Sequence, residues 1–136
     1  IIEKEAASQE DYYRVSAVLY NRIARGMKLE SDPTATYLTG QVKLALSESE
    51  INDPNLYNTY YVLGLPIGPI CNPSEDALNA ALYPNMEYVE QGYMFFCATD
   101  PAEGKLAFAI TRDEHLQNVE KYQQLWAAFD AAHPDN

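Results

Sequence analysis

The stretch DYYRVSAVLYNRIAR, residues 11–25, gives the strongest indication of the fold in this sequence. Apolar side chains within it fall at Tyr12, Val15, Leu19 and Ile23. These positions are three or four residues apart, which places them on one face of an α-helix. Gly26 follows, and glycine readily adopts the left-handed backbone conformation that ends many helices. We therefore predict an amphipathic helix that packs against a core and ends near residue 25.

The segments around this helix predict an α+β fold in one domain. The other predicted helical segments are Ile1–Ala7, Ser47–Ile51, Ser74–Leu82 and Thr111–His133. Two aromatic and apolar runs, Tyr93–Thr99 and Leu106–Ile110, are separated by turn residues and predict a β-hairpin. Residues 27–36 and 55–73 predict loops, and a loop as long as the second is often functional. The chain opens inside what reads as a helix already under way, so we expect a fragment of a longer protein.

Length and composition exclude several functional classes. The chain has 136 residues, 47% of them hydrophobic, which suits one globular domain. Its 20 acidic and 9 basic residues give a net charge of −11, which disfavours binding to nucleic acid or to anionic lipid. No apolar run approaches the roughly 18 residues that a membrane-spanning helix needs, and no signal peptide opens the chain. The two cysteines, Cys71 and Cys97, are expected to be packed thiols.

Metal and cofactor motifs are absent from the sequence, so the candidate chemistry falls to carboxylates. There is no glycine-rich phosphate loop and no cysteine pair with zinc-ligand spacing, and we predict no metal and no cofactor. His115 and His133 share one predicted helix, and we interpret them as surface or supporting residues. Glu3 and Glu5 are two residues apart on a helix, so one is expected to face inward. A carboxyl group held against apolar neighbours has a raised pKa and can act as a general acid; an exposed pair is the alternative.

Asp32 and residues 57–61 are the other candidates. Asp32 stands in a Ser-Asp-Pro-Thr turn, where it either forms the turn or lies at the rim of a cleft. The sequence Tyr57-Asn58-Thr59-Tyr60-Tyr61 combines aromatic rings with an amide and a hydroxyl. Such groups suit sugars, because rings stack on apolar sugar faces and amides bind hydroxyl or acetamido groups. Tyrosines packed in the core are the alternative.

The order of several short motifs resembles one known family. The motifs are IIEKEA at 1–6, VSAVLYNR at 15–22, GMKLESDPT at 26–34, YNTY at 57–60, GLPIGPI at 64–70, Asn72-Pro73 and Glu114-His115. Together they resemble the catalytic domain of the YceG-like family of endolytic murein transglycosylases, from Ile1 to about Val119. By this resemblance, residues 1–136 are one YceG-like catalytic domain, without the upstream LysM-like subdomain and membrane anchor of family members.

The resemblance implies an enzyme that cuts peptidoglycan glycan strands between N-acetylmuramic acid and N-acetylglucosamine, leaving 1,6-anhydro ends. The family's catalytic glutamate lies in its E-K-E motif, which carries over to Glu3 here, with Glu5 as the alternative. The implied substrate-binding residues are Asp32, Thr34, Tyr57, Asn58, Thr59 and Tyr60. Family members work at the extracytoplasmic face of the cell membrane. The implied partners are therefore glycan strands and cell-wall synthesis machinery, with membrane contact only through an N-terminal anchor.

Two other functions stay open at this point. A non-catalytic glycan-binding domain would use the same cleft without turnover. An aminodeoxychorismate lyase, an older label for relatives, would need pyridoxal phosphate, and no phosphate-binding glycine-rich loop accompanies the lysines. The chain also departs from the family pattern, because Leu106 stands where many relatives have the histidine of a G-x-H-x-F motif. If that histidine orients the substrate, we expect a weaker or differently tuned activity here.

Overall fold

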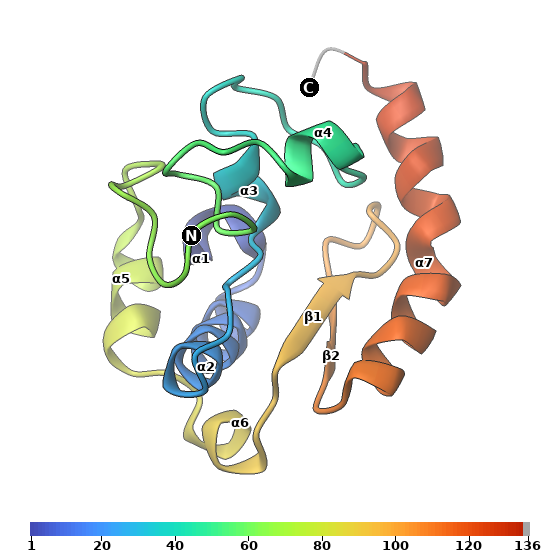
Figure 1. Ribbon diagram of the computed structural model, residues 1–136. Coiled ribbons are helices and arrows are strands. Elements are labelled where there is room, and N and C mark those ends of the chain that lie inside the picture. Colours follow the sequence, from blue (N-terminus) through green and yellow to red (C-terminus); the bar gives the residue numbers. More distant parts are fainter. Residues whose placement is uncertain (135–136) are drawn as a thin grey trace.

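The secondary structure combines helices with one small sheet (Figure 1). The computed structural model describes residues 1–134, and these form seven α-helices and two strands. The helices are α1 (Ile2–Glu5), α2 (Gln9–Ala24), α3 (Asp32–Ala35), α4 (Glu48–Ile51), α5 (Glu75–Leu82), α6 (Met86–Gln91) and α7 (Arg112–Ala132), and the strands are β1 (Phe95–Ala98) and β2 (Leu106–Ala109). This arrangement confirms the predicted α+β class in a single domain.

Helix α2 forms the centre of the core. It begins after Ser8, whose side chain accepts a hydrogen bond from the backbone N–H three residues on (3.2 Å), and the chain turns at Gly26 with a φ of +68°. Val15 and Leu19 on its inner face are buried against Leu29. The partly buried side chains packed around them are Ile1, Ile2, Ala6, Phe96, Leu106 and Phe108. The core therefore joins the N-terminal turn, α2 and the sheet; Val15 and Leu19 of the predicted apolar face are buried in it, whereas Ile23 is 47% exposed.

The two strands lie between α2 and α7, with α7 along their outer side (Figure 1). They are antiparallel, and Phe95 lies opposite Ala109. Helix α7 is joined to β1 by Trp126, whose indole N–H donates to the backbone carbonyls of Ala98 (3.1 Å) and Thr99 (3.3 Å). The predicted hairpin and C-terminal helix are confirmed.

Short helices account for the differences from the sequence-based prediction. Helix α3 lies inside residues 27–36, where we predicted only loop; Pro33 fixes a helical φ at its start, and an acidic side chain in the first turn is favourable there. Helix α6 was not predicted, although Asn85 caps its first turn and Gly92 ends it with a φ of +77°. Segments this short offer too few residues for a helical period to stand out.

Residues 55–73 contain neither helix nor strand, as predicted, and buried hydrogen bonds fix their path. Asn58 is fully buried, and its side-chain N–H groups donate to the backbone carbonyls of Ile51 (3.0 Å) and Asp53 (2.8 Å). Its side-chain oxygen accepts a hydrogen bond from the backbone N–H of Tyr60 (3.0 Å). The amide therefore ties the loop to the end of α4.

Candidate active site

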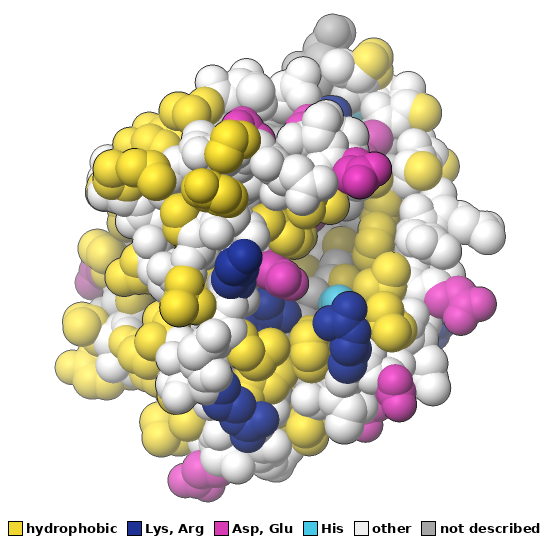
Figure 2. All heavy atoms as spheres, viewed as in Figure 1, with side chains coloured by type: hydrophobic (Ala, Val, Ile, Leu, Met, Phe, Trp, Pro, Cys, Tyr) yellow, Lys and Arg dark blue, Asp and Glu magenta, His cyan; other side chains and the backbone are white. Residues whose placement is uncertain are grey.

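A cavity of about 520 Å³ opens between the N-terminal half of the molecule and α7. Figure 2 shows that this face is hollowed near its centre, where acidic, basic and hydrophobic side chains gather. The charged and aromatic residues that line the cavity include Lys4, Glu5, Arg22, Glu30, Asp32, Tyr60, His115 and Trp126. They come from α1, α2, the segment around α3, the 55–73 loop and α7. The cavity therefore depends on segments that are far apart in the sequence.

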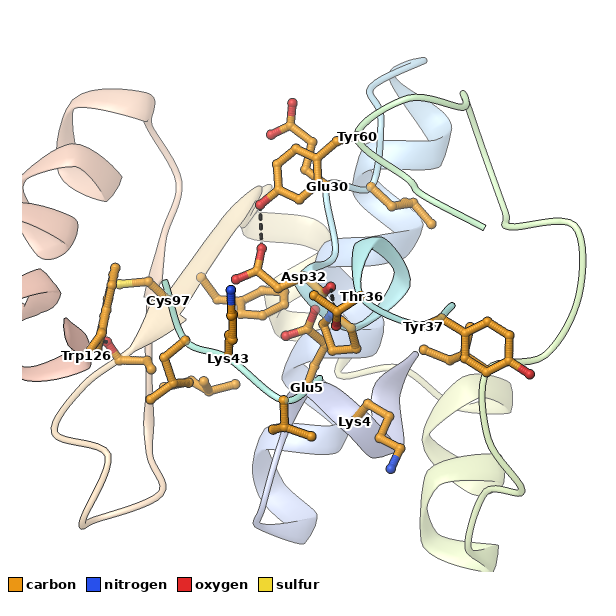
Figure 3. Close-up of a pocket in the computed structure, with 18 of the residues that line it drawn as sticks. Lys4, Glu5, Glu30, Asp32, Thr36, Tyr37, Lys43, Tyr60, Cys97 and Trp126 are labelled. Carbon is orange, nitrogen blue, oxygen red and sulfur yellow. Dashed lines mark hydrogen bonds between the residues drawn. The ribbon is translucent and has the colours of Figure 1, made fainter. Parts of the chain in front are cut away.

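Glu5 projects into this cavity from the end of α1 (Figure 3). One of its carboxyl oxygens accepts a hydrogen bond from the buried Ser31 hydroxyl (2.5 Å). Burial raises the pKa of Glu5 to about 7, and the nearby negative charge of Asp32 adds to the rise, while the Ser31 hydrogen bond and the charge of Arg22 oppose it. A carboxyl group with this pKa retains a proton in much of the population at neutral pH.

Asp32 lines the same cavity, together with Tyr60 (Figure 3). The Tyr60 hydroxyl donates a hydrogen bond to one Asp32 carboxylate oxygen (2.5 Å). Burial raises the pKa of Asp32 to about 6, and the hydrogen bond from Tyr60 opposes that rise by stabilising the ionised form. The cavity thus holds one carboxyl group that can donate a proton beside one that can stay ionised.

Glu3 occupies a different environment from Glu5. Its carboxylate accepts a hydrogen bond from the Ser74 hydroxyl (2.8 Å) in an exposed position, and it does not line the cavity. The geometry therefore favours Glu5, the alternative assignment, over Glu3 as the candidate proton donor. Sequence alone could not separate the two, because the difference arises from Ser31 and Asp32, which lie more than 25 residues further along the chain.

A buried network of hydroxyl groups supports Glu5 from behind. The Thr59 side-chain oxygen lies 2.7 Å from that of Thr34 and accepts a hydrogen bond from the Ser31 backbone N–H (2.8 Å). The Thr34 hydroxyl donates to the Ser31 backbone carbonyl (2.6 Å). Ser31 is therefore held on both sides of its backbone, and its own hydroxyl is directed to Glu5. Fully bonded buried networks of this kind define one side-chain arrangement.

Several predicted binding residues lie outside the cavity wall. Thr34, Asn58 and Thr59 are fully buried and their polar atoms are bonded within the protein. Tyr57 does not line the cavity either; its ring packs against that of Tyr37, with 4.5 Å between centroids. Their predicted direct contact with substrate has no geometric support, and they act here as the frame of the site. Of the predicted set, Asp32 and Tyr60 face the cavity.

Arg22 and Glu30 line the cavity although neither was singled out as a candidate. The buried Arg22 guanidinium donates to the backbone carbonyls of Met94 (2.6 Å) and Lys28 (2.9 Å), and it lies 3.7 Å from the Glu30 carboxylate. Glu30 has a φ of +49°, a strained left-handed conformation for a residue with a side chain. The signal in the sequence was Arg22 itself, since a cation inside an apolar helical face usually has a specific partner.

His115, which we interpreted from the sequence as a surface or supporting residue, lines the cavity. Its ring stacks on Phe95, with 5.0 Å between centroids, and among the described residues its buried Nδ1 has no hydrogen-bond partner. Burial lowers the pKa of His115, and the charges of Arg22 and Arg112 lower it further. Leu106, at the position where the resemblance expects histidine, lines the same cavity. The site therefore contains a neutral imidazole, but it belongs to His115 and not to the G-x-H-x-F position, which Leu106 occupies.

Within residues 1–134, no group of three or more His, Cys, Asp or Glu side chains is placed to hold a metal ion. Over the same residues, no helix has both the length and the apolar character needed to cross a bilayer.

Comparisons with known proteins identify the family of this chain. The profile of the YceG-like family matches residues 1–121. The chain therefore belongs to the YceG-like family, which confirms the resemblance noted from the motifs. A crystal structure of a YceG-like protein from Listeria monocytogenes is similar in fold, with a TM-score of 0.73 and 37% identity, over 85% of this chain and 35% of that one.

Two relatives carry the name endolytic murein transglycosylase. The protein from Bacillus subtilis is 36% identical over 124 residues, which is 90% of this chain and 32% of the relative. The protein from Streptococcus pneumoniae strain D39 is 32% identical over 127 residues, which is 90% of this chain and 22% of the relative. The chain thus spans between a fifth and a third of the length of these relatives.

Proposed function

We propose that this protein is a lytic transglycosylase that cleaves peptidoglycan strands internally, between N-acetylmuramic acid and N-acetylglucosamine. The observation that carries the proposal is the pair of carboxyl groups in one cavity, Glu5 with a pKa of about 7 and Asp32 with a pKa of about 6. The relatives named endolytic murein transglycosylase support the same substrate class. No cofactor is needed for the reaction described next.

In the proposed reaction, Glu5 donates its proton to the glycosidic oxygen as the bond from that oxygen to C1 of the muramic acid breaks. The Glu5 carboxylate then takes the proton of the C6 hydroxyl of the same sugar while the C6 oxygen bonds to C1. The products are a free hydroxyl on the leaving sugar and a 1,6-anhydro ring, and Glu5 is protonated again. Because the attack is intramolecular, proximity replaces an activated water or a second protein nucleophile.

Asp32 is the candidate for stabilising the positive charge that develops on the sugar ring. Its pKa of about 6 lies below the value of about 7 for Glu5, so Asp32 ionises first as the pH rises. The hydrogen bond from Tyr60 favours the Asp32 anion. That anion in turn favours the protonated form of Glu5, since two adjacent carboxylates repel each other. The surroundings of the two carboxyl groups therefore support Glu5 as the acid and Asp32 as the stabilising anion.

Digestion of purified peptidoglycan by the wild type, Glu5→Gln and Glu3→Gln tests this proposal. We expect the wild type to produce sugar ends that are one water lighter in mass spectra than hydrolysed ends. Glu5→Gln should lower the rate by at least about 100-fold, because it removes the general acid. Glu3→Gln, the matched substitution two residues away, should leave the rate nearly unchanged.

Three results would contradict the proposal in different ways. An inactive Glu3→Gln beside an active Glu5→Gln would transfer the proton donor to Glu3. Ends that retain a water would indicate a hydrolase. Binding of peptidoglycan by the wild type without any new ends would indicate a non-catalytic glycan-binding domain.

We further propose that the protein acts at the extracytoplasmic face of the membrane, where its partners would be glycan strands and the cell-wall synthesis machinery. The support for this location is the murein substrate named for its relatives. Protease treatment of intact protoplasts tests it: the domain should be degraded while a cytoplasmic marker survives. Protection of the domain until the membrane is lysed would overturn the assignment.

A further inference from the structure

A second hollow adjoins the cavity on the far side of Asp32 and Tyr60. Its volume is about 510 Å³, and it lies between the segment after residue 43 and the second half of α7. Its lining residues are Asp32, Leu44, Ala45, Leu46, Ile51, Tyr60, Gln123, Gln124, Trp126 and Ala127. Asp32, Leu44, Tyr60 and Trp126 line both the cavity and this second hollow. The two spaces are therefore consecutive parts of one groove, with Asp32 at their junction.

Trp126 is the fixed aromatic wall at this junction. Figure 3 places it on the side of the cavity away from Tyr37, next to Cys97. Its indole N–H is already bonded to the carbonyls of Ala98 and Thr99, so the orientation of the ring is set by the end of β1. With its polar atom satisfied, the ring offers a ligand only an apolar surface, which suits the apolar face of a sugar ring.

The charge of the lining distinguishes the two parts of the groove. The cavity contains Lys4, Arg22 and Lys43 as well as its acidic groups, whereas Asp32 is the only charged residue among the described residues that line the second hollow. Its polar side chains beyond Asp32 and Tyr60 are the amides Gln123 and Gln124, which can donate to and accept from hydroxyl and acetamido groups. An uncharged amino sugar fits this lining better than a peptide or an anion.

The wall opposite Trp126 is held in place by the same helix. The Asp130 carboxylate accepts hydrogen bonds from the backbone N–H groups of Leu44 (3.1 Å) and Ala45 (2.9 Å). Both Trp126 and Asp130 lie beyond residue 121, where the match to the family profile ends. The second hollow is thus built in part by residues that the family match does not include.

We propose that the second hollow is a glycan subsite for an N-acetylglucosamine residue next to the scissile bond, with Trp126 as its stacking platform. This inference rests on the proposed function, since it takes the cavity to hold the neighbouring muramic acid. A groove that continues on both sides of Asp32 accommodates the interior of a strand, which is what internal cleavage requires.

The experiment uses the fact that Trp126 is the only tryptophan of the chain. Its fluorescence is followed while the intact protein is titrated with the N-acetylglucosamine tetramer. We expect a saturable change in emission in the wild type. Calorimetry should then give a dissociation constant at least about tenfold weaker for Trp126→Ala and within about threefold of wild type for Trp126→Phe.

A matched pair of substitutions separates the second hollow from the cavity. Ala127 lines the second hollow, whereas the adjacent Ala128 is exposed and lines neither space. Ala127→Leu should weaken binding of the tetramer by about fivefold or more through loss of space, while Ala128→Leu should stay within about twofold. Both variants keep Trp126 as the reporter, and a melting temperature equal to that of the wild type would show that their fold is intact.

The outcomes distinguish this inference from the proposed function. No emission change with the tetramer, or equal binding by Ala127→Leu and Ala128→Leu, would overturn the subsite even if peptidoglycan is cleaved. Tetramer binding that Ala127→Leu weakens, in a protein that produces no anhydro ends, would support the subsite and overturn the enzyme. If Trp126→Ala does not fold, the comparison of tetramer binding by Ala127→Leu and Ala128→Leu decides the question.

Discussion

At the scale of single residues, the properties of Glu5 come from its neighbours. A general acid works best when its pKa is close to the working pH, and burial near Asp32 raises the pKa of Glu5 to about 7. The Ser31 hydroxyl keeps the group oriented at 2.5 Å without removing the effect of burial. The same residue type at Glu3, in an exposed hydrogen bond to Ser74, lacks that environment.

The raised pKa of Glu5 predicts how stability depends on pH. In the unfolded chain Glu5 ionises near 4.5, and in the folded protein near about 7, so between these values the folded state binds more protons. The free energy of unfolding should therefore fall as pH rises through this window. Denaturation by urea should show wild type losing about 1–3 kcal/mol relative to Glu5→Gln across the window. Parallel stability curves for the two proteins would contradict the assignment of this pKa.

The pair of carboxyl groups predicts a bell-shaped pH–rate profile. The proposed reaction requires ionised Asp32 and protonated Glu5, so the rate should be highest at a pH between about 6 and about 7. A single plateau that extends through this range would mean that one of the two groups has no role in the reaction.

Tyr60→Phe should move the acidic limb of that profile. The substitution removes the hydrogen bond to Asp32 (2.5 Å), so the pKa of Asp32 rises and less of it is ionised at neutral pH. We expect the rate near neutral pH to fall by about tenfold and the acidic limb to shift upward. Tyr61→Phe is the matched control, because Tyr61 is half exposed and lines neither part of the groove.

At the scale of elements, Asn58 fixes the path of the loop over residues 55–73, because its side chain replaces missing backbone hydrogen-bond partners. Asn58→Ala would remove the hydrogen-bond partner of the Ile51 and Asp53 carbonyls and of the Tyr60 backbone N–H. We expect a loss of about 2–4 kcal/mol in the free energy of unfolding, measured by chemical denaturation. Asn72→Ala, in an exposed part of the same region, should cost less than about 0.5 kcal/mol. Equal losses in the two variants would remove the special role of Asn58.

Elements with local signals could be predicted from the sequence, and those without could not. Ser8 before α2 and Thr111 before α7 cap their helices through residues three positions away, which is a pattern visible in the sequence. Asn58 carries no such signal. Its amide suggested contact with a sugar, but its partners in the structure are carbonyls of the preceding turn. Whether a polar side chain faces a ligand or the interior depends on packing that the sequence does not display.

At the scale of the whole molecule, the groove depends on contacts between distant segments. Its carboxylates come from the N-terminal quarter of the chain, and its aromatic wall comes from α7 near the C-terminus (Figure 1). Sequence comparison identified the family, and the hairpin and α7 were predicted. The contact by which Asp130 joins α7 to the segment at Leu44 and Ala45 was not predicted, because a single acidic residue on a helix forms no distinguishing pattern.

We expect Asp130→Ala to make the wall of the groove at Leu44 and Ala45 more mobile. Without the carboxylate, the backbone N–H groups of Leu44 and Ala45 lose their acceptor, and amide hydrogen exchange there should accelerate by about tenfold or more. The melting temperature should change little, since Leu44, Ala45 and Asp130 do not belong to the core cluster around Val15. Glu120→Ala, an exposed change on the same helix, should leave exchange at Leu44 and Ala45 unaltered.

The attachment made by Asp130 uses main-chain N–H groups, and these are present whatever side chains the segment carries. The residues that face the hollow from this segment, Leu44, Ala45 and Leu46, can therefore be exchanged without detaching it from α7. The position of that wall therefore does not depend on its side chains. The backbone hydrogen bonds to Asp130 hold the segment, while the side chains that face the hollow are free to vary. Randomising these three residues should thus alter which saccharides are accepted and leave the architecture of the groove intact.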